Sequence, residues 1–167
     1  MGRAWRWGAV LGLSLELLAL GVWVGGLVVL IGAVIPAVFN TLGGQDSGGF
    51  LLTRTFEGYN RLVAAAFLIL VVVAGCRWRY GDAALAVTKS EAMLLVCMGL
   101  IAAAIIFVLH PLAATLQAEA FAAKDEQARK AAFEAFFRLH MPVRSLYMVN
   151  LGLGMGLLVM KAKRSLR

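Results

Sequence analysis

The chain has 167 residues, 62% of them hydrophobic, and a mean hydropathy of +0.85. These values lie outside the range of soluble globular domains. The formal net charge is +7, but the basic residues follow a membrane pattern rather than one binding face, so we expect no nucleic-acid partner. The two cysteines lack the spacing of a disulfide framework or a zinc site.

Four apolar runs account for most of the chain, and they cover residues 7–36, 56–76, 91–110 and 143–160. A helix rises 1.5 Å per residue and needs about 20 apolar residues to cross the ~30 Å hydrocarbon core of a bilayer. Each run reaches about that length. The sequence therefore predicts an all-α integral membrane protein, a single domain over residues 1–167 that forms a four-helix bundle in the lipid bilayer.

The first run begins after an interfacial anchor, Trp5-Arg6-Trp7, and its length requires the helix to tilt or protrude. Pro36 marks its exit. Residues 40–49 (NTLGGQDSGG) are rich in turn-forming residues and predict a loop. After the second run, residues 81–90 predict a short turn.

Residues 111–141 form the one sizeable polar segment and are rich in good helix formers. Phe133, Phe136, Phe137 and His140 fall at i, i+3, i+4 and i+7, which is one face of a helix. We expect an extramembrane helical hairpin, or two helix extensions, between the third and fourth spans. Its apolar stripe is expected to pack on itself or to lie in the membrane interface.

The charges differ between the two sides of the predicted membrane protein. With the N-terminus in the cytoplasm, the inner side has nine Lys and Arg against two acidic residues, and the outer side has five against six. Because an excess of Lys and Arg marks the cytoplasmic side, both termini are expected to be cytoplasmic. The predicted location is the bacterial inner membrane.

Two pairs of glycines have the spacing of close helix contacts. Gly21 and Gly25 lie in the first run, and Gly152 and Gly156 lie in the fourth. Small residues four apart share one helix face and allow two backbones to approach. They predict a contact between the first and fourth helices, or a homodimer.

Polar residues gather at the predicted outer ends of the spans and form the candidate ligand site. They are Arg61, His110, His140, Arg144, Tyr147 and Asn150. One interpretation is a cavity for an anion, a metal or a haem, since ionisable groups at membrane depth usually face a bundle interior. The other is that these side chains snorkel to the headgroups and anchor the helix ends.

His110 and His140 are the only histidines, and they flank the polar segment. The pair could hold a haem iron axially or bind copper, but two ligands are too few for a structural metal site. We therefore favour hydrogen-bonded structural histidines and expect no metal or other cofactor.

Glu16 is the acidic residue deepest in an apolar run. It is either a proton-carrying carboxylate or an ion-pair partner of Arg6 or of a lysine near the C-terminus. We favour the ion pair.

Several short motifs follow one another in a characteristic order. They are residues 19–27 (ALGVWVGGL), residues 35–39 (IPAVF), the loop glycines with Tyr59, His110-Pro111, residues 136–140 (FFRLH) and Asn150-Leu151. In these motifs the chain resembles a bacterial family of small four-helix membrane proteins known as a domain of unknown function. That family is similar to the transmembrane protein 205 family of eukaryotes, and copper-resistance D-type proteins are similar in outline. The resemblance implies four helices with a polar segment before the last. The family's histidine positions correspond to His110 and His140, without a ligand role.

No motif of an enzyme is present in the sequence, so we expect a protein that is not an enzyme. The favoured function is an accessory or scaffold subunit that associates with other membrane proteins or with itself. The alternatives are a protein that handles a metal or small molecule through the outer His/Arg cluster, and a haem-bearing redox subunit.

Overall fold

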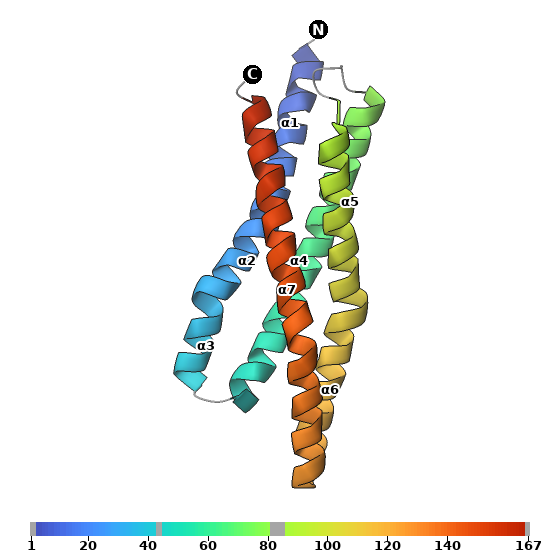
Figure 1. Ribbon diagram of the computed structural model, residues 1–167. Helices are drawn as coiled ribbons and strands as arrows, with labels where there is room; N and C mark the ends of the chain where they lie inside the picture. Colours follow the sequence, from blue (N-terminus) through green and yellow to red (C-terminus); the bar gives the residue numbers. More distant parts are fainter. Residues whose placement is uncertain (1–2, 43–44, 81–85, 166–167) are drawn as a thin grey trace.

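The computed structural model describes residues 3–42, 45–80 and 86–165, and these residues are almost entirely helical (Figure 1). Four helical stretches are long and apolar enough to cross a membrane: Trp7–Leu42, Gly48–Arg79, Lys89–Ala122 and Glu126–Arg164. These features mark the chain as a multi-pass membrane protein. The start of α1 and the end of α7 lie at the same end of the molecule (Figure 1). We call this the terminal end and the opposite one, at the α6–α7 turn, the hairpin end.

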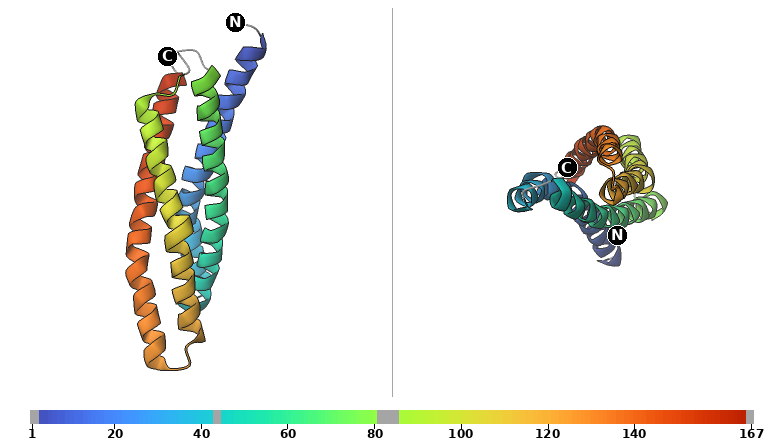
Figure 2. Two further views of the ribbon diagram at one scale, coloured as in Figure 1. Left: turned by 90° about the vertical axis from the view of Figure 1, so that its right-hand side faces the viewer. Right: turned by 90° about the horizontal axis from the view of Figure 1, so that it is seen from below.

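The first stretch is one helix in which two π-helical segments interrupt the α-helix. It comprises α1 (Arg3–Leu20), the π-helical η1 (Gly21–Gly25), α2 (Gly26–Val29), the π-helical η2 (Leu30–Val34) and α3 (Ile35–Leu42). Helices bend at π-helical segments. The start of α1 leans away from the other helices (Figure 2). Pro36 does not end the helix, which continues through Leu42.

The second stretch is α4 (Gln45–Tyr80), which begins inside the segment that the sequence predicted to be a loop. The prediction for residues 40–49 was wrong, apart from residues 43–44, which lie outside the described residues. Tertiary packing explains the difference, because it overrides weak helix propensity. A Cβ on Gly48 would stand 3.3 Å from Val38 on α3, so the glycine lets the two helices approach closely.

The third and fourth stretches also extend well beyond the predicted spans. The third comprises α5 (Lys89–Ala104), the π-helical η3 (Ile105–Leu109) and α6 (His110–Ala122), and the fourth is α7 (Glu126–Ser165). The hydroxyl of Thr88 accepts a hydrogen bond from the backbone N–H of Glu91 and caps α5. Pro142 lies inside α7 without ending it. The predicted turn over residues 81–90 is shortened by this start of α5, and residues 81–85 lie outside the described part of the chain.

The polar segment over residues 111–141 forms two helix extensions, α6 and the first half of α7, which lie side by side (Figures 1 and 2). The ring of Phe121 on α6 meets the ring of Phe133 on α7 edge to face, with centroids 5.9 Å apart. Ala120 is fully buried between them. The apolar stripe therefore packs in part on the hairpin itself, while Phe137 stays exposed.

Glycines do bring helices together, but not the ones that the spacing indicated. A Cβ on Gly154 of α7 would come within 2.6 Å of Val24 in η1, and a Cβ on Gly99 of α5 would come within 2.4 Å of the Phe67 ring on α4. In contrast, Gly21, Gly25, Gly152 and Gly156 have no side chain or foreign backbone within 4 Å of such a Cβ. The contact of the first and fourth helices thus runs through Gly154, on a different face of α7 from the predicted pair.

We expect Gly154→Ala to lower the free energy of unfolding by about 1–3 kcal/mol, because the new methyl group overpacks the contact with Val24. Gly152→Ala, two residues away on an open face, is the matched control and should be neutral or slightly stabilising, since alanine favours helix. Unfolding in mixed micelles measures both. Equal destabilisation by the two variants would contradict this packing.

Candidate functional site

The six polar residues of the predicted ligand site do not form one cluster. Tyr147 and Asn150 lie in the interior, where they meet Asn60, a buried residue of α4. His110 is half-buried, and the remaining three side chains are exposed: Arg61, His140 and Arg144. The set thus falls into two groups, because one part of it lines a pocket and another part lies on the surface.

Arg61 shows how neighbouring residues come to different surroundings. Successive residues of a helix point about 100° apart, so Asn60 faces inward while the Arg61 side chain is 77% exposed. Its guanidinium lies 2.6 Å from a carboxylate oxygen of Glu57, one turn away on α4. The charge of Arg61 is compensated on the surface of its own helix.

The two histidines lie near the start of α6 and midway along α7. The ring of His140 lies 6.0 Å from that of Phe136, one turn earlier. Neither imidazole bonds to another protein group in the part of the chain that the structure describes, so hydrogen-bonded structural histidines stay a prediction. Within that same part, no three His, Cys, Asp or Glu side chains converge as a metal site would require.

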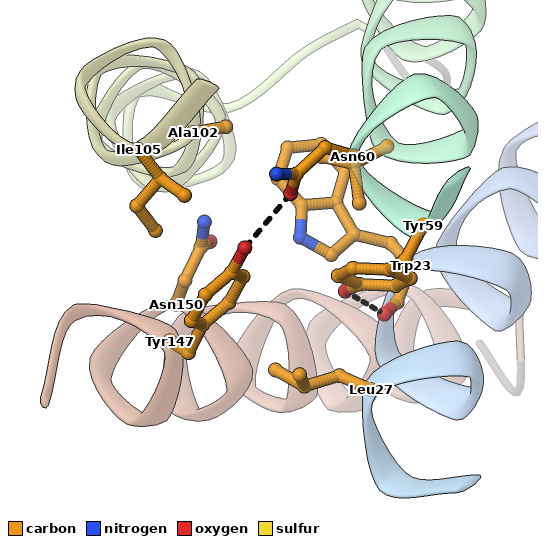
Figure 3. A pocket seen from close by; sticks show the side chains of 9 residues that line it. Trp23, Leu27, Tyr59, Asn60, Ala102, Ile105, Tyr147 and Asn150 are labelled. Atoms are coloured by element: carbon orange, nitrogen blue, oxygen red, sulfur yellow. Dashed lines mark hydrogen bonds between the residues drawn. The ribbon is translucent and has the colours of Figure 1, made fainter. Parts of the chain in front are cut away.

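A small pocket lies between the helices (Figure 3). Its cavity measures about 10 Å³, close to the least that holds one water molecule. All four long helical stretches contribute to its lining. The lining residues are Trp23, Leu27, Tyr59, Asn60, Val63, Ala102, Ile105, Tyr147 and Asn150.

Three hydrogen bonds tie the polar groups of the pocket to neighbouring helices. The Tyr59 hydroxyl donates to the backbone carbonyl of Trp23 at 2.7 Å, and the Tyr147 hydroxyl donates to Oδ1 of Asn60 at 2.9 Å (Figure 3). The Nδ2 group of Asn150 donates to the carbonyl of Met98 at 3.4 Å. These bonds join α4 to η1, α7 to α4, and α7 to α5.

Two π-helical segments border this pocket, since Trp23 belongs to η1 and Ile105 to η3. Polar groups that insert into the backbone ladder distort helices, and π-helical turns are frequent at functional sites. At η1 the Tyr59 hydroxyl donates to the Trp23 carbonyl, which also accepts from the backbone N–H of Gly26. Gly26 allows the approach, because a Cβ at that position would stand 3.0 Å from the Tyr59 ring.

Near the terminal end, a second polar site is built from charges. We call it the ionic cluster, and it consists of Glu16, Arg77, Glu91, Lys161 and Arg164. Lys161 Nζ lies 2.7 Å from Oε2 of Glu16 and 2.7 Å from Oε1 of Glu91. The same two carboxylates lie 2.8 and 2.7 Å from Nη1 of Arg77, and Arg164 adds a longer contact of 3.6 Å to Glu91.

The ionic cluster takes one charged residue from each of the four long stretches, with Arg164 as a fifth at its rim. Glu16, Glu91 and Lys161 are all more than nine-tenths buried. A buried charge loses several kcal/mol of hydration, so it is stable only where opposite charges and hydrogen bonds surround it. Each carboxylate here faces both Lys161 and Arg77. The two carboxylates and the two bases Lys161 and Arg77 therefore neutralise one another within the chain.

Sequence reasoning singled out Glu16 and one kind of partner for it, a lysine near the C-terminus, and overlooked the rest of the ionic cluster. Glu16 was expected to pair with Arg6 or with a lysine near the C-terminus, and in the structure it pairs with Lys161 and Arg77. The Arg6 side chain lies outside the described residues. The lysine near the C-terminus is thus Lys161, whereas Arg77, Glu91 and Arg164 were counted only as topological charges. The sequence did contain a pattern that could have predicted the cluster. Two acids and two bases lie at the same end of the four predicted spans.

A layer of apolar side chains separates the ionic cluster from the pocket. Along each stretch the residue of the ionic cluster is followed by the apolar layer and then by the pocket. On α7 these three levels are Lys161, Leu157 and Asn150. Eleven residues of α7 separate the lysine from the asparagine, which is about 16 Å. The layer is almost completely buried and comprises Ala19, Leu20, Ala66, Leu70, Met98 and Leu157.

This geometry defines a helical multi-pass membrane protein whose buried carboxylates are paired with bases of the same chain. The chain belongs to the family described as Domain of unknown function (DUF4149), whose model matches residues 18–122. The matched range begins just after Glu16. It includes the pocket residues of the first three stretches and the hairpin helix α6. No curated protein and no solved structure matches the chain.

We expect Lys161→Met to lower the free energy of unfolding by about 3–5 kcal/mol, because it leaves two buried carboxylates with one base fewer. Lys163→Met, on the exposed side of the same helix turn, should change stability by less than about 0.5 kcal/mol. Combining Lys161→Met with Glu16→Gln should cost less than the two single changes added together, since one charge of each sign is removed. Additive costs in unfolding experiments would show that these groups are not coupled.

Proposed function

We propose that this protein is an accessory or scaffold subunit of the bacterial inner membrane, without enzymatic activity, that associates with other membrane proteins or with a second copy of itself. The observation that carries the proposal is the open surface at two glycine pairs. Gly21 and Gly152 are exposed, Gly25 and Gly156 are half-buried, and a Cβ at any of them would meet nothing within 4 Å. Small residues on a lipid-facing helix let another helix approach closely.

The buried polar groups favour the same role. The two buried carboxylates of the ionic cluster are balanced by Lys161 and Arg77, and an apolar layer divides the cluster from the pocket. Such an interior supports a fixed four-helix bundle better than a pathway for ions across the membrane, which needs polar groups at every depth. The similarity to the transmembrane protein 205 family, and in outline to copper-resistance D-type proteins, is part of this proposal.

The second candidate is a protein that handles a metal or small molecule, or a haem-bearing redox subunit. Two of the predicted ligand residues, Tyr147 and Asn150, do line the pocket, but its cavity of about 10 Å³ holds no more than about one water molecule. A metal or haem would instead use His110 and His140, which lie on α6 and α7, the two helices of the hairpin. A bound metal or haem would be seen as added mass on the intact protein.

The proposed orientation places the termini in the cytoplasm and the hairpin end outside. We expect a green fluorescent protein fused to the C-terminus to fluoresce, since it folds in the cytoplasm. We expect alkaline phosphatase inserted in the turn after Lys124 to be active, because that enzyme needs the oxidising periplasm. The reverse pattern of the two reporters would overturn the orientation.

Association through the glycine faces is tested by native mass spectrometry of the protein extracted gently from its own membranes. We expect a defined assembly larger than the 17.9 kDa chain. Two double variants place leucines on the two faces: Gly21→Leu with Gly25→Leu, and Gly152→Leu with Gly156→Leu. We expect one of these double variants to reduce the assembled fraction at least tenfold. The monomer should keep its stability, because each new side chain enters open space.

Gly75→Leu is the matched control, since Gly75 is also exposed and open but is not part of a glycine pair. It should leave the assembly intact. A monomer from all preparations, or equal loss of assembly in the control, would argue against the scaffold role. Extra mass equal to haem or a metal ion, lost with His110→Ala or His140→Ala, would support the second candidate.

A further inference from the structure

Two amide atoms beside the pocket have no hydrogen-bond partner among the described protein groups. They are Nδ2 of Asn60 and Oδ1 of Asn150. The two residues are 5% and 3% exposed, and both line the same cavity. A buried polar atom without a partner costs about 1–3 kcal/mol, and native proteins rarely leave one so.

The other atom of each amide is engaged, and this fixes what the pocket offers. The Nδ2 group of Asn150 donates to the Met98 carbonyl, which can only accept, so Oδ1 of Asn150 must be the free atom. Oδ1 of Asn60 accepts from Tyr147, which leaves Nδ2 of Asn60 as a free donor. The indole nitrogen of Trp23, another donor, faces the space beside Asn60 (Figure 3).

The occupant must therefore accept hydrogen bonds on one side and donate one on the other. A cation does not fit, because N–H donors would point at it. The cavity of about 10 Å³ limits the occupant to about one water molecule. We propose that the pocket is the binding site of one ordered water, which accepts from Nδ2 of Asn60 and donates to Oδ1 of Asn150.

This water would complete a chain of hydrogen bonds across three helices. The chain runs from the Met98 carbonyl on α5 through Asn150 on α7, the water, and Asn60 on α4, to the hydroxyl of Tyr147 on α7. No direct bond joins Asn60 to Asn150, so the water is what couples them. Buried waters of this kind typically make about three hydrogen bonds and form part of the native structure.

Solid-state NMR of the full chain in lipid bilayers, with nitrogen-15 in the asparagine side chains, tests the site. We expect a cross-peak between water and the Asn60 side-chain amide in the wild type. Asn150→Leu removes the acceptor, so the peak should weaken at least severalfold. Met148→Leu, an exposed change of similar volume two residues away, should keep it. The absence of the peak in the wild type, or its persistence in Asn150→Leu, would overturn the proposal.

Ala102→Val provides a second test that leaves both amides unchanged. Ala102 lines the cavity and is buried, so the two added methyl-sized carbons compete with the water for its space. We expect the cross-peak to Asn60 to disappear in this variant while the Asn150 amide signal stays resolved. A cross-peak of wild-type strength in Ala102→Val would show that the water seen by Asn60 lies elsewhere.

Discussion

The ionic cluster is the interaction on which the arrangement of the helices depends. Each of the four long stretches places a charged side chain at one level, and two carboxylates share one lysine and one arginine at 2.7–2.8 Å. In a membrane protein an unpaired buried charge is costly, so a helix that slid by one turn would lose its partners. The cluster therefore selects one register of the helices more sharply than apolar contacts can.

Close packing then builds outward from that register. Below the cluster, Gly99 and Gly154 let the Phe67 ring and Val24 approach the helix backbones, and the buried layer around Leu157 closes the interior. Lipid chains are as apolar as these side chains, so close van der Waals fit, rather than escape from water, is what holds such a layer. Where the layer ends, the π-helical segments η1 and η3 contribute Trp23 and Ile105 to the lining of the small polar pocket.

The interior and the surface thus serve different purposes. Inside, the charges pair with one another, and the amides of Asn60 and Asn150 bond to a tyrosine hydroxyl and a backbone carbonyl. These bonds hold the four stretches together. On the outside, the open faces at Gly21 and Gly152 leave room for another helix to approach. This division is the physical basis for proposing a structural role in the membrane, with the partner bound through the surface rather than through the pocket.

The amino-acid sequence by itself determined the helical class and the number of long apolar stretches, because length and hydropathy are properties of each segment alone. It also singled out Tyr147, Asn150 and Glu16, since polar groups in apolar runs are conspicuous. It did not predict that residues 40–49 are largely helical, because their helix depends on contacts such as that of Gly48 with Val38.

Only the tertiary structure decided which side chains meet. Small residues recur on every span, and spacing cannot say which of them face a neighbour, so Gly154 was missed and Gly152 was chosen. Arg61 and Asn60 are adjacent in the chain, yet one is solvated and the other is buried, because the rotation of α4 against its neighbours sets the buried face. The ionic cluster joins partners that lie from 14 positions apart (Arg77 and Glu91) to 145 positions apart (Glu16 and Lys161), and such distant partners are defined only when the helices pack.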